Sequence, residues 1–335
     1  MLPKIDLNVT DPKTTRYRRT HNTPVADTEN RLNELYGAWK TVLCNSGMEA
    51  INTVFYLLKP DVIICDDDTY FETRICIDWL GIKKIQLENL NNLDALEKAL
   101  KSASGRVLVC GDSPTTFGEW RDVWNISDIA HKYGAYVMMD NSIVSMYYSN
   151  PLRDGADIVV ESYTKYVCGY GDTFAGGIAF SDSMKWLDEV EVPVQNPGLK
   201  SIRWVTAYRG NVVSQYAAYM VARGLETLAV RMKRHTESAR IIYRVLKEAG
   251  INARYCGYGG LISLPGLGED FCKKLKAFIP IGTFGCTYSN SDFFRSNDRY
   301  KEGFCARISV GLEDVDILIA DLENAFGISL MKYKE

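Results

Sequence analysis

The chain has 335 residues, a net charge of −3, and an ordinary balance of 46% hydrophobic and 24% charged residues. This length is enough for one large domain and a smaller one, and the near-neutral charge gives no reason to expect nucleic acid or anionic lipid as a partner. No apolar run reaches the ~20 residues of a membrane span, and the N-terminus is too polar for a signal peptide, so we expect a cytoplasmic protein with no membrane partner.

The chain begins with a polar segment that lacks a strong apolar period. We expect residues 1–36 to form an extended arm followed by a short helix. The arm carries four basic residues, Lys13, Arg16, Arg18 and Arg19. They form either a solvated basic arm or an anion clamp, and an arm of this kind can reach a neighbouring subunit.

From residue 40 onward, short apolar strands alternate with helical patterns, which predicts an α/β fold with a mostly parallel sheet covered by helices. The predicted strands are 40–44, 61–65, 83–87, 106–111, 136–140 and 158–160. One predicted helix begins near residue 48, a second ends near residue 80, and two more span 92–101 and 126–133.

After residue 179 the pattern changes. We expect a loop at 193–198 and a long helical stretch at 206–249 with a break or bend near Gly224. Short strands at 261–264 and 307–310 and helices at 271–278 and 314–326 predict a smaller α+β domain. The expected division is an arm with a short helix (1–40), an α/β domain (41–224) and a C-terminal α+β domain (225–335).

Polar residues follow several of the predicted strands. Ser46, Tyr70, Ser113, Asp140 and Lys165 all fall at or just beyond a strand's carboxyl end. Ligands of parallel sheets bind at that edge, so we expect these residues to share one site. The turn at Ser46 leads into a helix, whose free N–H groups and dipole attract an anion.

The inventory of reactive residues points to a lysine. Nine cysteines occur without a Cys-x-x-Cys pair, which predicts buried thiols and no metal site, and histidine is present only at 21, 131 and 235. Lys165 follows the strand 158–160 and is flanked by Ser162 and Thr164. Two hydroxyls and an amine can hold a phosphate-bearing aldehyde as a Schiff base, although the motif alone also fits a solvated lysine at a strand end.

Motifs in a consistent order over roughly residues 15–326 resemble the Cys/Met-metabolism family of pyridoxal-phosphate enzymes, the fold-type I group that includes cystathionine γ-synthase, cystathionine γ-lyase and methionine γ-lyase. The matching segments are Tyr17-x-Arg19-x-x-Asn22, Ser46-Gly47-Met48-x-Ala50-Ile51, Asp140-Asn141, Ser162-x-Thr164-Lys165-Tyr166, Arg223-Gly224-Leu225-x-Thr227-Leu228 and Arg307-x-Ser309-Val310-Gly311-Leu312-Glu313-Asp314. Each segment alone is a weak signal, and the ordered set is a strong one.

The resemblance implies a role for each matching residue. Lys165 would hold pyridoxal 5′-phosphate as a Schiff base, Asp140 would keep the pyridine nitrogen protonated, and Tyr70 would stack on the ring and serve as acid or base. Arg307 would bind the α-carboxylate of an amino-acid substrate. The residues implied for the phosphate are Ser46, Gly47, Met48, Ser162 and Thr164, with Tyr17 and Arg19 reaching it from a second subunit.

The chain departs from the family pattern on the substrate side. Glu72 and Tyr288 replace residues that lie near the substrate side chain in relatives, Thr283 begins the block that contains Tyr288, and Thr116 replaces an asparagine near the cofactor. Glu72 is either a solvated acid at a helix start or a substrate contact that favours a hydrogen-bond-donating or positively charged side chain. These departures predict family chemistry on an atypical amino acid.

The resemblance therefore implies a lyase, dependent on pyridoxal 5′-phosphate, that eliminates a leaving group from Cβ or Cγ of an L-amino acid. We expect a homodimer or homotetramer whose active sites are shared between subunits. γ-Replacement of the cystathionine synthase kind is the alternative within the enzyme class, and a catalytically silent cofactor-binding module is the alternative outside it. The leaving group, the choice between β and γ chemistry and the oligomer size stay open.

Overall fold

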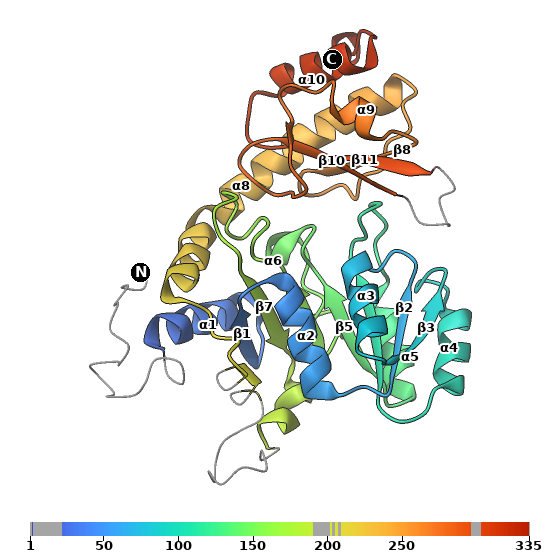
Figure 1. The fold of residues 1–335 in the computed structure, drawn as a ribbon, viewed down its shortest axis with the longest axis vertical. Helices are drawn as coiled ribbons and strands as arrows, with labels where there is room; N and C mark the ends of the chain where they lie inside the picture. The colour runs from blue at the N-terminus through green and yellow to red at the C-terminus, as the bar shows by residue number, and fades with distance from the viewer. Residues whose placement is uncertain are drawn as a thin grey trace.

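The computed structural model describes residues 2, 22–189, 202, 205, 206, 209–295 and 303–334. The arm residues Tyr17 and Arg19 and the expected loop at 193–198 lie outside the described residues. The described chain forms a large sheet with helices around it and a smaller sheet above its edge, as Figure 1 shows.

The large sheet has the strand order β1-β7-β6-β5-β4-β2-β3. Among these strands β7 is antiparallel to both of its neighbours, and the strands from β6 to β3 pair in parallel, which confirms the predicted mostly parallel sheet. The strands are β1 (Lys40–Cys44), β2 (Val62–Asp66), β3 (Lys83–Leu87), β4 (Val107–Asp112), β5 (Tyr136–Asp140), β6 (Ile158–Glu161) and β7 (Gly176–Phe180).

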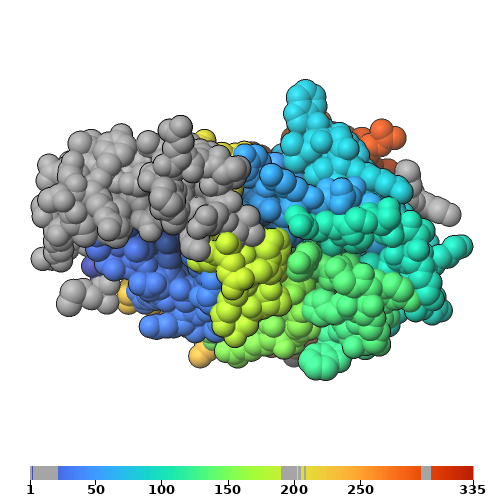
Figure 2. Space-filling view, turned by 90° about the horizontal axis from the view of Figure 1, so that it is seen from below, coloured from blue at the N-terminus to red at the C-terminus, as the bar shows by residue number. Residues whose placement is uncertain are grey.

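Helices cover both faces of this sheet because its strands are apolar on both sides. In β2, Ile63 and Cys65 join the core beneath α2, whereas Val62 and Ile64 join the core beneath α4 and α5. The helices are α1 (Thr23–Tyr36), α2 (Gly47–Leu58), α3 (Phe71–Trp79), α4 (Leu93–Ser102), α5 (Val123–Lys132) and α6 (Ser145–Tyr148), followed by the 3₁₀ helix η1 (Asp182–Asp188). Figure 2 views the end of the molecule opposite the smaller sheet, where η1, in yellow-green, lies near the middle.

The smaller sheet has the order β8-β11-β10-β9. Its strands are β8 (Leu261–Pro265), β9 (Ile279–Pro280), β10 (Asn290–Arg295) and β11 (Phe304–Ser309), and its helices are α9 (Glu269–Cys272), α10 (Val315–Phe326) and the 3₁₀ helix η3 (Met331–Tyr333). Ala306 and Ile308 of β11 pack into the core formed with α8 and α10. Because side chains alternate along a strand, Arg307 points away from this core.

The long helix α8 (Gln215–Glu248) connects the two parts of the molecule. Its first turns pack beside Tyr163 and Val167 of the large domain, and its last turns pack in the core of the smaller sheet. The domain boundary proposed between residues 224 and 225 therefore falls inside α8.

Two predicted helices differ from the structure. The stretch predicted at 206–249 begins as an α-helix only at Gln215, where the Ser214 side chain caps it. Of the predicted break or bend near Gly224, the break is wrong, because the helix continues to Glu248. Gly224 serves close packing instead, because a Cβ there would lie 2.0 Å from the Val167 carbonyl oxygen. The prediction of a helix at 271–278 was also wrong beyond Cys272, because the backbone N–H groups of Lys276 and Ala277 donate hydrogen bonds to the Asp321 carboxylate.

Candidate active site

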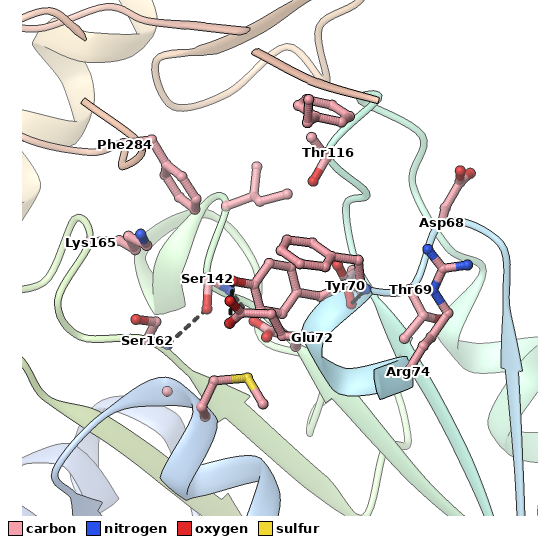
Figure 3. A pocket seen from close by; sticks show the side chains of 18 of the residues that line it. Asp68, Thr69, Tyr70, Glu72, Arg74, Thr116, Ser142, Ser162, Lys165 and Phe284 are labelled. Carbon is pink, nitrogen blue, oxygen red and sulfur yellow. Dashed lines mark hydrogen bonds between the residues drawn. The ribbon is translucent and has the colours of Figure 1, made fainter. Parts of the chain in front are cut away.

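A cavity of about 940 Å³ lies at the carboxyl edge of the large sheet and extends to the smaller sheet. Its walls come from strand ends and loops far apart in the sequence, as the close-up in Figure 3 shows. The cavity thus joins the predicted anion-binding turn, the predicted lysine and the predicted arginine. The predicted site residues that line it are Ser46, Gly47, Met48, Tyr70, Glu72, Thr116, Asp140, Ser162, Thr164, Lys165 and Arg307.

Lys165 lies just beyond β6 and presents its amine to the cavity. Its Nζ donates a hydrogen bond to Thr283 Oγ1 at 3.1 Å and lies 4.7 Å from the centre of the Phe284 ring. Burial and the nearby positive charge of Arg307 lower the pKa of Lys165 to about 8. A large share of this amine is therefore neutral, and hence nucleophilic, at mildly basic pH.

Asp140 ends β5 and lies beside Asp112, its register partner at the end of β4. Burial raises the pKa of Asp140, and burial together with the neighbouring Asp140 raises the pKa of Asp112 further. Asp140 is held by the Ser142 N–H, which donates to its Oδ1 at 2.8 Å. A buried acid, Asp112, and a partly buried one, Asp140, at one strand edge favour a positively charged or hydrogen-bond-donating partner in the cavity.

The turn between β1 and α2 forms an anion cradle. Ser46 caps α2 by accepting a hydrogen bond from the Glu49 N–H, and the Gly47 and Met48 N–H groups precede the first intrahelical bond. Gly47 is required for close approach, because a Cβ there would lie 2.7 Å from the Ser162 Cβ. The helix N-terminus and the Ser162 hydroxyl therefore bound one anion-sized corner of the cavity.

The two residues that flank the lysine, Ser162 and Thr164, make different hydrogen bonds. The Thr164 hydroxyl donates to the Ala175 carbonyl and accepts from the Ala175 N–H, both at 3.1 Å, so it ties the lysine loop to the start of β7. The Ser162 N–H donates to Ser142 Oγ at 2.7 Å. Ser142 thus connects the Asp140 carboxylate to the lysine segment.

Tyr70 and Glu72 lie together at the start of α3. The Tyr70 hydroxyl donates to Glu72 Oε2 at 2.8 Å, as the dashed line in Figure 3 shows. Burial and the adjacent Glu72 carboxylate raise the pKa of Tyr70. The phenol is therefore held in its protonated form, which suits a proton donor better than a base.

The turn before Tyr70 is held by a buried ion-pair cluster. Arg121 Nη2 lies 2.6 Å from Asp66 Oδ2 and 3.5 Å from Asp68 Oδ2. The other oxygen of Asp66 accepts from the Thr69 N–H and hydroxyl, at 2.9 and 3.0 Å. This network sets the position from which Tyr70 enters the cavity.

Arg307 on β11 pairs with Asp292, its register partner on β10. Its Nε donates to Asp292 Oδ1 at 2.8 Å, and its Nη2 donates to Asp292 Oδ2. The guanidinium carbon lies 5.4 Å from the centre of the Phe284 ring and 5.7 Å from that of Phe294. The arginine expected to face a substrate carboxylate thus has a carboxylate of its own chain on one edge.

The other residues predicted on the substrate side, Thr116, Thr283 and Tyr288, differ in how they lie relative to the cavity. Thr283 is at the site through its hydrogen bond with Lys165, and Thr116 lines the cavity while its carbonyl accepts from the Ser263 hydroxyl at 2.7 Å. Tyr288 does not line the cavity and lies beside Gly171 and Cys286.

Sequence reasoning missed several residues of the site. Ser142 could have been found, because it follows the Asp140-Asn141 pair by one position. Asp292 and Phe294 carried no local signal, because the strand β10 that aims them at the cavity was not predicted. Phe284 lies in the block that runs from Thr283 to Tyr288, but its place between Lys165 and Arg307 depends on a contact between the two domains.

No group of three or more histidine, cysteine, aspartate or glutamate residues able to hold a metal ion is found in the described part of the chain. Within 22–189, 209–295 and 303–334, no helix has the length and apolarity that crossing a membrane requires.

A lysine with a lowered pKa, a partly buried acid and an anion cradle at a helix N-terminus in one cavity define a site for an aldehyde cofactor with a phosphate and a basic ring. The family profile described as Cys/Met metabolism PLP-dependent enzyme matches residues 6–286. The chain belongs to this family, whose cofactor is pyridoxal 5′-phosphate.

Individual relatives cover nearly the whole chain. It is 28% identical to L-methionine gamma-lyase of Pseudomonas putida, over 93% of this chain and 85% of the relative. It is 27% identical to cystathionine gamma-synthase of Haemophilus influenzae, over 92% of this chain and 86% of the relative. The crystal structure of a methionine gamma lyase from Micromonospora echinospora shares the fold with a TM-score of 0.83 at 24% identity, over 96% of this chain and 93% of that one.

The residues present fit the cofactor. Asp140 is a partly buried acid for which a protonated ring nitrogen would be the positive partner, and the lack of a Cβ at Gly47 lets the α2 N-terminus lie close to Ser162, because a Cβ there would be 2.7 Å from the Ser162 Cβ. Lys165 is an amine with a lowered pKa in the same cavity. These three features come from separate elements, and each would suit a different part of the cofactor.

Proposed function

We propose that this protein is a lyase that eliminates a leaving group from Cβ or Cγ of an L-amino acid, with carbon–sulfur bond cleavage as the nearest model. The observation that carries the proposal is the convergence of Lys165, Asp140 and Arg307 on one cavity. Their functional groups match the aldehyde, the ring nitrogen and the substrate carboxylate. The named relatives include both methionine gamma-lyase and cystathionine gamma-synthase, and they support this class of chemistry.

When bound, the cofactor supplies an electron sink that stabilises negative charge at the substrate α-carbon. Asp140 would hold the ring nitrogen protonated, and the α2 N-terminus with Ser162 and Thr164 would bind the phosphate. Lys165 would be the base that takes the α-proton, because its lowered pKa of about 8 leaves a large share of the amine deprotonated at mildly basic pH. Arg307 would orient the α-carboxylate.

Tyr70 would donate a proton to the leaving group. Its raised pKa keeps the phenol protonated, and its hydrogen bond to Glu72 sets the direction of the hydroxyl. Glu72 and the aromatic wall formed by Phe117, Phe293 and Phe294 would shape the pocket for an atypical side chain. Thr116 and Thr283 stay as further proposed contacts on the substrate side, whereas Tyr288 does not line the cavity and is no longer proposed as a contact.

We also propose that the protein is a homodimer or homotetramer in which Tyr17 and Arg19 reach the phosphate of a neighbouring site. Phe71 and Phe174 line the cavity, yet 53% and 78% of their surfaces are exposed in the single chain. A second copy at the cavity mouth would cover them. We propose a cytoplasmic location, which agrees with cysteines that form no disulfide in the described chain.

The test is a screen of L-amino acids with leaving groups at Cβ or Cγ. Elimination releases a keto acid and ammonia, whereas replacement with an added thiol gives a new amino acid without ammonia, so product identification separates the proposed lyase from the alternative transferase. Lys165→Ala should abolish product and also the borohydride-reducible linkage to the cofactor. A reducible linkage at another lysine would overturn the assignment, and a linkage without turnover of any compound would favour a catalytically silent module.

A further inference from the structure

Asp292 occupies one edge of the arginine proposed to bind the substrate carboxylate. A guanidinium presents five N–H donors, and a carboxylate pairs with it through two parallel hydrogen bonds. Asp292 already makes such a pair with the Nε and Nη2 donors of Arg307. Three N–H groups of the guanidinium are left for a ligand, two on Nη1 and one on Nη2.

The strand register places Asp292 and Arg307 next to each other. Asp292 and Arg307 are opposite each other in the register of β10 and β11, and both side chains line the cavity. Their side chains are only 19% and 15% exposed. The rings of Phe284 and Phe294 flank the guanidinium, which limits its rotation away from Asp292.

A site that hydrogen-bonds a substrate group normally rejects compounds that lack the group, because its own buried donor is then left unpaired. Arg307 is not left unpaired when the substrate lacks a carboxylate, because Asp292 satisfies its charge. The negative charge of Asp292 also repels a second carboxylate on the same guanidinium. Both effects reduce the advantage of a ligand that carries an α-carboxylate.

We propose that Asp292 is a specificity-determining residue that relaxes the requirement for an α-carboxylate, so that the site also binds small primary amines. This inference rests on the proposed function, in which Arg307 faces the α-carboxylate. The chemical class of the additional ligand is an unbranched alkylamine that carries the amine of an amino acid without its carboxylate.

The experiment titrates the cofactor-loaded enzyme with L-alanine and with ethylamine, which differ only in the carboxylate, and follows the absorbance of the bound cofactor. Neither probe has a leaving group, so binding is measured without turnover. The ratio of the two Kd values is compared between the wild type and Asp292→Asn, which keeps the shape and one acceptor but removes the charge. Comparing ratios between variants cancels the different basicities of the two amines.

We expect Asp292→Asn to raise the ratio of the ethylamine Kd to the alanine Kd about 10-fold, the scale of a charge-assisted hydrogen bond. Asp270→Asn removes an exposed acid of α9 as the matched control and should leave the ratio unchanged. An unchanged ratio in Asp292→Asn, or weaker alanine binding with ethylamine unaffected, would overturn the inference while the proposed function stands. If neither probe changes the wild-type absorbance, the proposed function fails, and this inference fails with it.

Discussion

The Tyr70 hydroxyl donates a hydrogen bond to the carboxylate of Glu72, two residues further along the chain, at 2.8 Å. The carboxylate is one of the causes, with burial, of the raised pKa of Tyr70. Glu72 lies in the first turn of α3, so the same acid also interacts with the helix N-terminus. The two residues act as one unit at the cavity wall.

Replacing Glu72 with glutamine should shift the pH dependence of catalysis. Glu72→Gln removes the negative charge that raises the pKa of Tyr70, so the phenol should ionise at lower pH than in the wild type. If the protonated phenol is the donor, the basic limb of the kcat/KM profile should move to lower pH. The profile is measured between pH 7 and about 11, with Glu88→Gln as the exposed control. A basic limb that does not move would show that Tyr70 ionisation does not limit the reaction.

Attachment of the cofactor to Lys165 should follow the lysine's lowered pKa. The neutral amine reacts, so the attachment rate should rise about tenfold per pH unit below pH 8 and level off above it. Arg307→Ala removes a positive charge that disfavours the ammonium form, so the plateau should move to higher pH. The rate is followed by absorbance after adding pyridoxal 5′-phosphate to cofactor-free protein. A wild-type rate that keeps rising past about pH 10, as for an ordinary lysine, would contradict the lowered pKa.

Gly47→Ala should weaken cofactor binding. The new Cβ would lie 2.7 Å from the Ser162 Cβ, so the α2 turn and the serine must separate. Overpacking of this kind costs about 1–3 kcal/mol, or about 10-fold or more in affinity. The matched control is Gly282→Ala in the same cavity, where the nearest atom to the added Cβ is 3.9 Å away. Equal cofactor Kd values for the two variants would remove Gly47 from the cradle.

Gly224→Ala should destabilise the protein, although the same change usually stabilises a helix by about 0.5–1 kcal/mol. The added Cβ would lie 2.0 Å from the Val167 carbonyl oxygen, so α8 must move away from the lysine loop. We expect the free energy of unfolding to fall by about 1–3 kcal/mol, measured by denaturant titration. Glu237→Ala at an exposed site of α8 is the control and should stay within about 0.5 kcal/mol. A stabilised Gly224→Ala variant would refute the close packing.

Mixing two inactive variants should restore activity if the arm acts on a neighbouring subunit. An Arg19→Ala chain keeps Lys165, and a Lys165→Ala chain keeps Arg19, so each mixed dimer has one complete site. Random mixing of equal amounts should give about one quarter of the wild-type activity. Each variant is also refolded or exchanged with itself as the control. Absence of recovery after confirmed subunit exchange would place Arg19 outside the neighbouring site.

Local pattern was enough to predict the α/β alternation and the edge of the sheet that carries the site. The strands 40–44, 83–87 and 136–140 have the predicted bounds, because a buried strand is a short apolar run between turn residues. The sequence also placed Lys165 and Asp140 at this edge, since Asp140 ends one predicted strand and Lys165 follows another by a few residues, and both line the cavity.

Pairings between distant segments were decided only by the tertiary structure. Lys165 and Thr283 are 118 positions apart, and neither residue's neighbours indicate that their side chains meet. The pairing of Asp292 with Arg307 depends on the register of two strands, and a shift by one residue would turn either side chain to the opposite face. Gly224 looked like a helix break because glycine weakens helices, yet the approach of Val167 gives it a packing role. The composition and hydrophobic period of a segment predict that segment's own helix or strand. The register of paired strands and the close packing of helices depend on contacts between segments that are distant in the sequence.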